Sequence, residues 1–282
     1  MISTTINTGP FHPIDHKHLM SNTFQCTQCG LCCVGLNIPL SVNEALLWIA
    51  RGNRVKILVE AIPWVTEQVL LSDSLKRKET ITFTGISGTL AIRLQVTLVA
   101  YFSQACPHLN EHNRCGIYDE RPMTCRVYPF ELNPNRLLNP NNKLCPKEAW
   151  SLTDTSAQSI QQKNIQFSII DSQTQSNINT IHQRNVNEVS IKQQLCVALG
   201  IRSCSLSNDG YLFHQVNQTQ LLAHLQSLTT GSCSGDSLKD PHDLSWLIHS
   251  NSNATLQNLV DIGSHCEATH ALSSGQEYIH FQ

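Results

Sequence analysis

The chain has 282 residues, enough for one large domain or two smaller ones. Hydrophobic residues make up 40% of it, as in an ordinary soluble protein, but only 14% are charged, against about a quarter in an average domain. The formal net charge is -2, so charge provides no case for nucleic acid or an anionic membrane as the main partner.

The first ten residues lack the basic segment and apolar run of a secretory signal. No stretch has the roughly 18 uncharged apolar residues that a membrane helix needs, and the best candidate, residues 90–102, contains Arg93 and Gln95. We therefore expect a soluble, cytoplasmic protein with no membrane partner. Thiols stay reduced in that compartment, so dense cysteines indicate metal or redox chemistry, with a disulfide framework as the alternative.

We expect three parts: a flexible N-terminal arm over residues 1–20, a cysteine-cluster metal-binding domain over residues 21–150 and a helical C-terminal region over residues 151–282. The arm contains His12, His16 and His18 at a spacing that could hold a metal ion. A solvated polar tail is the simpler interpretation, because no core surrounds these side chains.

Four cysteines stand within eight residues, at Cys26, Cys29, Cys32 and Cys33. Thiolates at two-residue spacing fold a tight loop that can present several sulfurs to one ion. Adjacent side chains such as Cys32 and Cys33 cannot easily both point at one site. One of the two serves a second site or is a free thiol.

A helix is expected directly after this loop. Ser41 is its N-cap, Glu44 completes a capping box, and Gly52 suits the C-terminal turn. A second helical stretch is expected over residues 55–78, broken or kinked near Pro63. Alternating apolar residues then predict a half-buried β-hairpin, with strands near residues 81–84 and 90–98 and a turn over residues 85–88.

The second cysteine group comprises Cys106, Cys115, Cys125 and Cys145. We expect Asp119 to cap a short helix with Pro122 in its first turn, which places Cys125 inside the helix and Cys115 in the loop before it. Together the two groups supply eight thiols. That is enough for two four-sulfur sites, or for one cluster plus spare thiols.

Helical patterns dominate after residue 146. Residues 185–199 form a helix closed by Gly200, and Asn217 caps a second helix. Asp240 and Pro241 open a third that runs to Ile248, and residues 255–262 form a fourth. The predicted fold class is therefore α+β: a small Cys-rich domain with helices and a β-hairpin, followed by a mainly helical region.

The pattern of the thiols leaves two metals open. Zinc takes four sulfurs from paired C-x-x-C knuckles, whereas bacterial ferredoxins use three cysteines at two-residue spacing and a fourth followed by proline. Three cysteines here have that spacing, and Cys106 and Cys145 each precede proline. The pattern slightly favours an iron–sulfur cluster, in the 4Fe-4S form, over Zn²⁺.

Each bound thiolate adds negative charge that nearby cations and donors must offset. Arg121 and Arg126 stand beside the ligands in sequence and are candidates for this, together with the backbone N–H groups of residues 30–35. Tyr118 and Tyr128 could cover the site and donate hydrogen bonds, although core packing accounts for them equally well.

The cysteine blocks resemble a known family, the CxxCxxCC zinc- or iron-chelating domain of bacteria. The matching blocks are Cys26-x-x-Cys29-x-x-Cys32-Cys33, Cys106-Pro-x-Leu109, Cys115-x-Ile-Tyr118, Arg121-Pro122-x-x-Cys125-Arg126 and Tyr128-Pro129-Phe130. The resemblance implies a cytoplasmic metal-binding domain with the cysteines as ligands. It covers residues 22–146 and leaves the insertion before Cys106 and the helical region unexplained.

The metal ligands expected from these blocks are Cys26, Cys29, Cys32, Cys33, Cys106, Cys115, Cys125 and Cys145. The other cysteines, Cys196, Cys204, Cys233 and Cys266, lack paired spacing. Cys196 lies in an apolar helical run, where buried packing is the simplest interpretation. Cys266 with His265 and His270 could bind metal, although solvated side chains are the simpler interpretation.

Three functions follow from these observations. The first is a metal-binding protein without its own catalysis, with an unidentified protein partner. The second is an enzyme similar to the flagellin lysine N-methylases, which share this domain and are linked to an iron–sulfur cluster; no G-x-G-x-x-G fingerprint, G-x-S-x-G elbow or H-E-x-x-H helix supports it. The third, a zinc-dependent nucleic-acid module, ranks last because the chain is weakly acidic.

Overall fold

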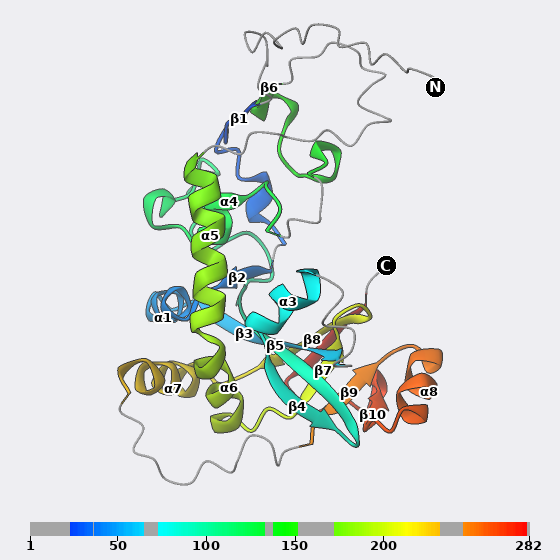
Figure 1. The fold of residues 1–282 in the computed structure, drawn as a ribbon. Coiled ribbons are helices and arrows are strands. Elements are labelled where there is room, and N and C mark those ends of the chain that lie inside the picture. The colour runs from blue at the N-terminus through cyan, green and yellow to red at the C-terminus, as the bar shows by residue number, and fades with distance from the viewer. Residues whose placement is uncertain are drawn as a thin grey trace, which may run out of the picture.

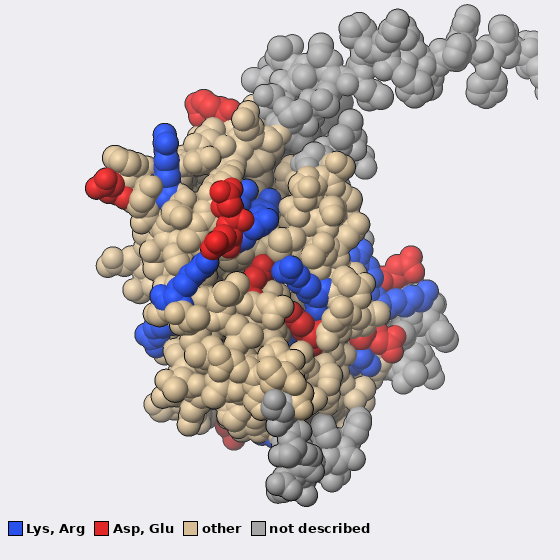
Figure 2. Space-filling view, turned by 90° about the vertical axis from the view of Figure 1, so that its left-hand side faces the viewer, with Lys and Arg blue, Asp and Glu red and all other residues tan. Residues whose placement is uncertain are grey.

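The computed structural model describes residues 23–35, 37–64, 73–132, 138–151, 172–231 and 245–280 (Figure 1). Its fold is α+β, as the sequence predicts: a mixed sheet with helices packed on it. None of the helices in these ranges has the length and apolar content needed to span a bilayer. On the face shown in Figure 2, charged side chains lie mostly across the upper and middle parts, and few lie in the area below.

The strands of the described ranges form two sheets. β1 (Thr23–Phe24) pairs with β6 (Trp150–Ser151) in a small antiparallel ribbon. The large sheet has the order β10-β9-β7-β3-β5-β2, with β4 on β5, and β8 between β3 and β11. Its strands are β2 (Ile38–Leu40), β3 (Arg54–Pro63), β4 (Phe83–Ser87), β5 (Leu90–Tyr101), β7 (Ser203–Leu206), β8 (Gly210–Gln215), β9 (Leu247–Ser250), β10 (Cys266–Ala268) and β11 (Gln276–His280).

The helices cover this sheet and extend above it. They are α1 (Val42–Ala50), α3 (Asp73–Thr80), α4 (Met123–Val127), α5 (Ser172–Asn187), α6 (Val189–Ala198), α7 (Gln218–Thr230) and α8 (Asn253–Asp261). In Figure 1, α5 runs from the level of the sheet up along α4, so it joins the sheet to the cysteine-rich segments above.

The predicted capping box at the start of α1 is confirmed. The Glu44 amide donates to Ser41 Oγ over 3.3 Å, and the Ser41 amide donates to Glu44 Oε2 over 2.8 Å. The predicted hairpin is also confirmed as β4 and β5, although β4 continues to Ser87 and the turn is shorter than expected. The helix capped by Asn217 is present as α7, and the helix predicted over residues 255–262 is present as α8. The helix closed by Gly200 is present as α6, although residues 185–187 belong to α5.

The prediction of a helix over residues 55–63 is wrong, because this segment is strand β3. The strand is paired with β5 on one side and with β7 and β8 on the other. Both of its faces are buried over most of its length, so its apolar residues run almost continuously and do not alternate. Pro63 ends the strand, where a missing N–H costs little. The end of the expected helix does form, as α3.

The prediction of a helix ending at Ile248 is wrong over its last residues. Residues 240–244 lie outside the described ranges, but Leu247–Ser250 is strand β9, parallel to β7 and β10. Ile248 is fully buried between these strands. A short apolar run cannot be assigned to a helix or a strand by its pattern alone.

The C-terminal half is therefore not only helical. It contributes β7 to β11, and these strands complete the sheet that contains β3 and β5. One core cluster joins Ile57 and Leu98 with Leu195, Leu221 and Ile248. Residues on both sides of the expected boundary at residue 150 thus build one sheet and share one core.

A carboxyl group in this sheet makes stability depend on pH. Glu60 of β3 lies opposite Gln95 of β5 and Ser205 of β7. Burial raises the pKa of Glu60 to about 7 from 4.5, and the nearby charge of Lys78 only partly opposes the rise. The stabilisation from the protonated form is complete below the unfolded pKa and is lost as pH rises through 7.

We expect Glu60→Gln to remove this dependence. Relative to the variant, the wild-type free energy of unfolding should fall by about 3 kcal/mol between pH 5 and pH 8, since each unit of pKa shift corresponds to about 1.4 kcal/mol. Urea denaturation at both pH values measures the difference, with the exposed Glu111→Gln as the control. Equal pH dependence in wild type and Glu60→Gln would contradict the assignment.

Candidate metal centre

Two cysteine-bearing loops meet at one end of the paired strands β2 and β5. The first loop leads into β2, and the second follows β5. β2 pairs with β5 antiparallel, and beyond the strands Val34 bridges Ala105. The amide of Cys106 then donates to the carbonyl of Cys33 over 2.7 Å. The pairing of these strands therefore places Cys33 beside Cys106, although 72 residues separate them in the chain.

Gly30 allows the first loop to lie against the second. It has φ +73°, and a Cβ built on it would lie 2.5 Å from the carbonyl oxygen of Asn113. A side chain at this position would therefore clash with backbone as well as strain the turn. The short 3₁₀ turn Leu31–Cys33 follows, with the Cys33 amide bonded to the Gly30 carbonyl.

The second loop is held in shape by its own polar groups. Asn110 Oδ1 accepts from the amides of His112 and Arg114, and the amide of Gly116 donates to the carbonyl of His108 over 2.7 Å. This loop carries Cys115.

The chain then enters α4, which contains Cys125 as predicted. The predicted cap is wrong: Pro122 is the N-cap of α4, and Asp119 lies in the preceding 3₁₀ turn, Tyr118–Glu120. Arg126 fixes this turn, since its guanidinium donates to the carbonyls of Asp119 and Arg121.

A second strand pairing, that of β1 with β6, brings Cys145 to the first cysteine loop. β1 precedes Cys26 and pairs with β6, which follows Cys145, and the amide of Gln25 donates to the carbonyl of Ala149. The rings of Phe24 in β1 and Trp150 in β6 pack against each other, with their centroids 4.9 Å apart and their planes tilted by 56°. Tyr128 Oη accepts from the amide of Leu144 over 2.9 Å and so holds the segment beside Cys145.

These contacts gather all eight predicted thiols around one cavity of about 260 Å³. The cavity is lined by Cys26, Cys29, Cys32, Cys33, Cys106, Cys115, Cys125 and Cys145. Within the described ranges, however, no three His, Cys, Asp or Glu side chains are arranged to hold a metal ion. The thiols thus line the wall of one cavity.

The thiol of Cys33 interacts with that of Cys32 and with the thiols of the second loop and α4. Its pKa is lowered, chiefly by the hydrogen bond that the Cys32 thiol donates to it. Burial and the charges of Cys106, Cys125 and Cys115 act in the opposite direction. The same hydrogen bond, together with burial, raises the pKa of Cys32.

Cys145 has its partners in the first loop. Burial raises its pKa to about 12, and the charges of Cys32, Cys26 and Cys29 add to the rise. Burial likewise raises the pKa of Cys125 to about 12 and that of Cys106 above its usual value. Without a cation to balance them, these thiols are held in the protonated form.

Three of the four predicted neighbouring side chains line the cavity. Arg121 lies over the ring of Tyr118, 4.0 Å from its centroid, and both contribute to the wall. Arg126 does not line the cavity; its contacts are with backbone carbonyls. Tyr128 lines the cavity and hydrogen-bonds to Cys145.

Trp48 of α1 is a wall residue that the sequence reasoning missed. It is 3% exposed, lines the cavity and packs edge-on against His108 at 4.8 Å. Its Nε1–H is buried and has no hydrogen-bond partner among the described residues. The sequence signal was present, since Trp48 lies on the same face of the predicted helix as Ala45 and Ile49, but its partners lie far away in the chain.

The remaining cysteines do not join the cavity. Cys196 and Cys204 are buried in the core, which confirms the packing role predicted for Cys196. Cys233 and the histidines of residues 1–20 lie outside the described ranges. His265 Nδ1 is bonded to Ser245 Oγ and Cys266 Sγ to a backbone carbonyl, and no metal site forms there among the described residues.

Residues 25–146 match the model of a protein family, and this segment includes every thiol of the cavity. The match covers less than half of the chain and leaves out most of the strands and helices after residue 146. No curated protein and no solved structure matches the chain. Residues 25–146 are therefore similar to the CxxCxxCC family, whose description is "putative zinc- or iron-chelating domain".

Proposed function

We propose that this protein binds iron–sulfur clusters of the 4Fe-4S type through the thiolates of the cysteine cavity and acts as a cytoplasmic metal-binding protein without catalysis of its own. The observation that carries the proposal is the convergence of eight thiols, from four segments of the chain, on one cavity. Thiolates are soft ligands that select zinc or iron–sulfur clusters over hard cations.

The arrangement of the thiols supports a cluster over a single zinc ion. A zinc site draws four sulfurs to within about 2.3 Å of one point, whereas a cluster keeps its ligands apart around a larger inorganic core. Here eight thiols surround one cavity of about 260 Å³, which is twice the number of sulfurs that one zinc ion takes. Zn²⁺ bound by the same thiolates is the alternative.

We assign the thiols to two groups of four, with Cys32 between them, since its charge also acts on Cys106 and Cys125. Strands β2 and β5 bring together Cys33, Cys106, Cys115 and Cys125. The β1–β6 ribbon brings together Cys26, Cys29, Cys32 and Cys145. Adjacent residues cannot easily both be ligands of one site, so we assign Cys32 and Cys33 to different groups that meet where the Cys32 thiol donates to Cys33, and two adjacent metal sites result.

The surrounding residues suit the charge of such sites. Each group of four thiolates carries surplus negative charge, and Arg121 at the wall opposes it. Trp48 supplies a buried N–H without a protein acceptor, which is the donor that a metal-bound sulfur would accept from.

When bound, the clusters would supply one-electron transfer. The protein's own residues hold the thiolates, limit contact with water and balance charge. A protein partner is the expected recipient of electrons or metal, and nucleic acid is not, since the chain carries 19 basic against 21 acidic residues.

The direct test is elemental analysis with an absorption spectrum on full-length protein purified without oxygen. We expect iron and acid-labile sulfide, with a broad visible charge-transfer band. Colourless protein with stoichiometric zinc would show that the thiolates bind Zn²⁺ and not a cluster. Protein that binds neither metal would overturn the proposed metal-binding function.

Two cysteine variants test the division into two sites. We expect Cys125→Ser and Cys145→Ser each to lose about half of the bound metal, because each removes one ligand from a different group. Both should also lower the midpoint of thermal unfolding, since metal binding and folding are coupled. The buried Cys196→Ala is the control and should keep its metal. Loss of all metal in both variants would indicate one shared site.

Trp48→Phe tests the role of the indole N–H. The variant keeps an aromatic ring against His108 but removes the donor. We expect metal content to be unchanged and the reduction potential to become more negative, because a hydrogen bond to sulfur stabilises the reduced, more negatively charged cluster. Protein-film voltammetry measures the shift. An unchanged potential would assign Trp48 to packing alone.

A further inference from the structure

We propose that a second cavity, separated from the thiols by β2 and α4, binds a small organic anion with an apolar body. This anion pocket has a volume of about 340 Å³ and is the larger of the two cavities described here. Thr124 contributes to the walls of both cavities. The inference does not depend on which metal the thiols bind.

The charge of the lining carries the proposal. Four cationic side chains line the anion pocket, against one carboxylate. The cations are Arg77, Lys78, Arg184 and Lys192, and the carboxylate is that of Glu44. The whole chain has slightly more acidic than basic residues, so this excess of positive charge is local to the pocket.

The one carboxylate is already engaged. Glu44 Oε2 accepts from the amide and hydroxyl of Ser41, and Oε1 accepts from the amide of Met123 over 2.8 Å. Arg184 lies 3.4 Å from the same Oε1. Glu44 thus links α1 to α4, and the positive charge of Arg184 balances the negative charge of its carboxylate.

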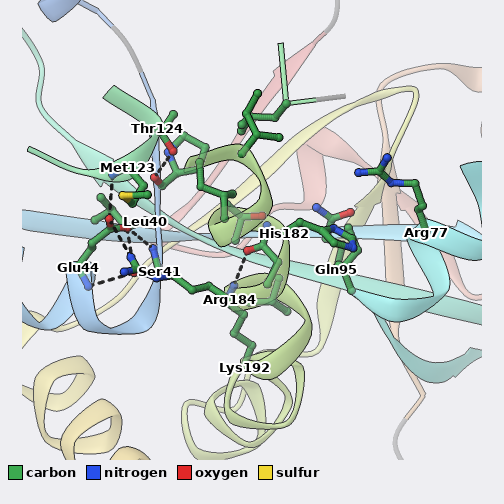
Figure 3. A pocket seen from close by; sticks show the side chains of 18 of the residues that line it. Leu40, Ser41, Glu44, Arg77, Gln95, Met123, Thr124, His182, Arg184 and Lys192 are labelled. Carbon is green, nitrogen blue, oxygen red and sulfur yellow. Dashed lines mark hydrogen bonds and ion pairs between the residues drawn. The ribbon is translucent and has the colours of Figure 1, made fainter. Parts of the chain in front are cut away.

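Two cations of α3 form no ion pair with a carboxylate that lines the pocket, although the charge of Lys78 also acts on the buried carboxyl group of Glu60. No ion pair joins Arg77 or Lys78 to a carboxylate within the described part of the chain, whereas Lys76 on the same helix pairs with Asp73 and Lys192 pairs with Glu188 at 3.1 Å. Figure 3 shows Arg77 on the opposite side of the pocket from Glu44, with Gln95 and His182 between them. Unpaired cations at the rim of a cavity attract an anion.

The rest of the wall is apolar. Leu40 and Val96 come from the sheet, Ile81 follows α3, and Ile178 and Ile181 come from α5. A free inorganic ion would leave the half-buried Ile81, Ile178 and Ile181 partly facing water, whereas an apolar body would cover them. The volume lies within the roughly 300–1,000 Å³ typical of small-molecule sites.

The ligand class is therefore a carboxylate or phosphate monoester attached to an apolar group. The acidic end pairs with Arg77 and Lys78, and the apolar body lies between the sheet and α5. A ligand with a positive centre is disfavoured, because the only lining carboxylate among the described residues is committed to Ser41, Met123 and Arg184.

Binding of octanoate to the full-length protein tests the proposal by isothermal titration calorimetry. We expect Lys78→Gln and Arg77→Gln each to weaken octanoate binding about tenfold, the loss expected for one charge-assisted contact. Lys76→Gln is the matched control, since it removes the same charge two residues away from a side chain that does not line the pocket. Lys76→Gln should bind octanoate with the same affinity as the wild type.

Comparison ligands separate the parts of the claim. Octanol and octylamine should bind much more weakly than octanoate, and raising the salt concentration should weaken octanoate binding. Equal binding of octanol would overturn the role of the cations, and inorganic phosphate binding as tightly as octanoate would overturn the role of the apolar wall. If S-adenosylmethionine binds more tightly than octanoate, and this binding is lost in Lys78→Gln, the proposed ligand class is wrong. Unfolding curves of each variant establish that the protein is folded.

Discussion

The antiparallel pairing of β2 with β5 is the constraint on which the cysteine site depends. Leu40 lies opposite Leu98 and Ile38 opposite Ala100, and all four side chains are buried. The ladder ends in the hydrogen bond between the Cys106 amide and the Cys33 carbonyl. The site is thus built on the edge of a sheet whose other strands come largely from the second half of the chain. Burial of the sheet, which provides most of the stability, also positions the thiols.

The thiols are gathered at an electrostatic cost that a bound metal would remove. Burial and mutual repulsion hold several of them in the protonated form, with the pKa values of Cys125 and Cys145 near 12. A cation that replaces these protons turns the repulsion into ligation and couples metal binding to the stability of the loops. The same wall faces the anion pocket on its other side. The molecule therefore has two adjacent cavities of opposite chemistry, one lined by thiols and one by cations.

Local signals in the sequence predicted local structure well. The Ser41–Glu44 capping box, the alternation in residues 90–98 and the Asn217 cap each act within a few residues, and each is present in the structure. The cysteine spacing likewise indicated all eight thiols that line the cavity. Contacts between segments far apart in the chain could not be predicted from such local signals. Residues 55–63 form a strand because β5, β7 and β8 surround them, and two of these partners lie more than 140 residues away. Trp48 and the cations of the anion pocket become neighbours of their sites only through the tertiary fold.

The central claim is that the thiols of one cavity hold metal in two adjacent groups. Anomalous diffraction from crystals of protein purified without oxygen, recorded at the iron and zinc edges, tests it most directly. The account predicts iron density at two positions, one bounded by Cys33, Cys106, Cys115 and Cys125 and the other by Cys26, Cys29, Cys32 and Cys145. Metal bound outside this cavity, or a single site that leaves four of the thiols free, would contradict it.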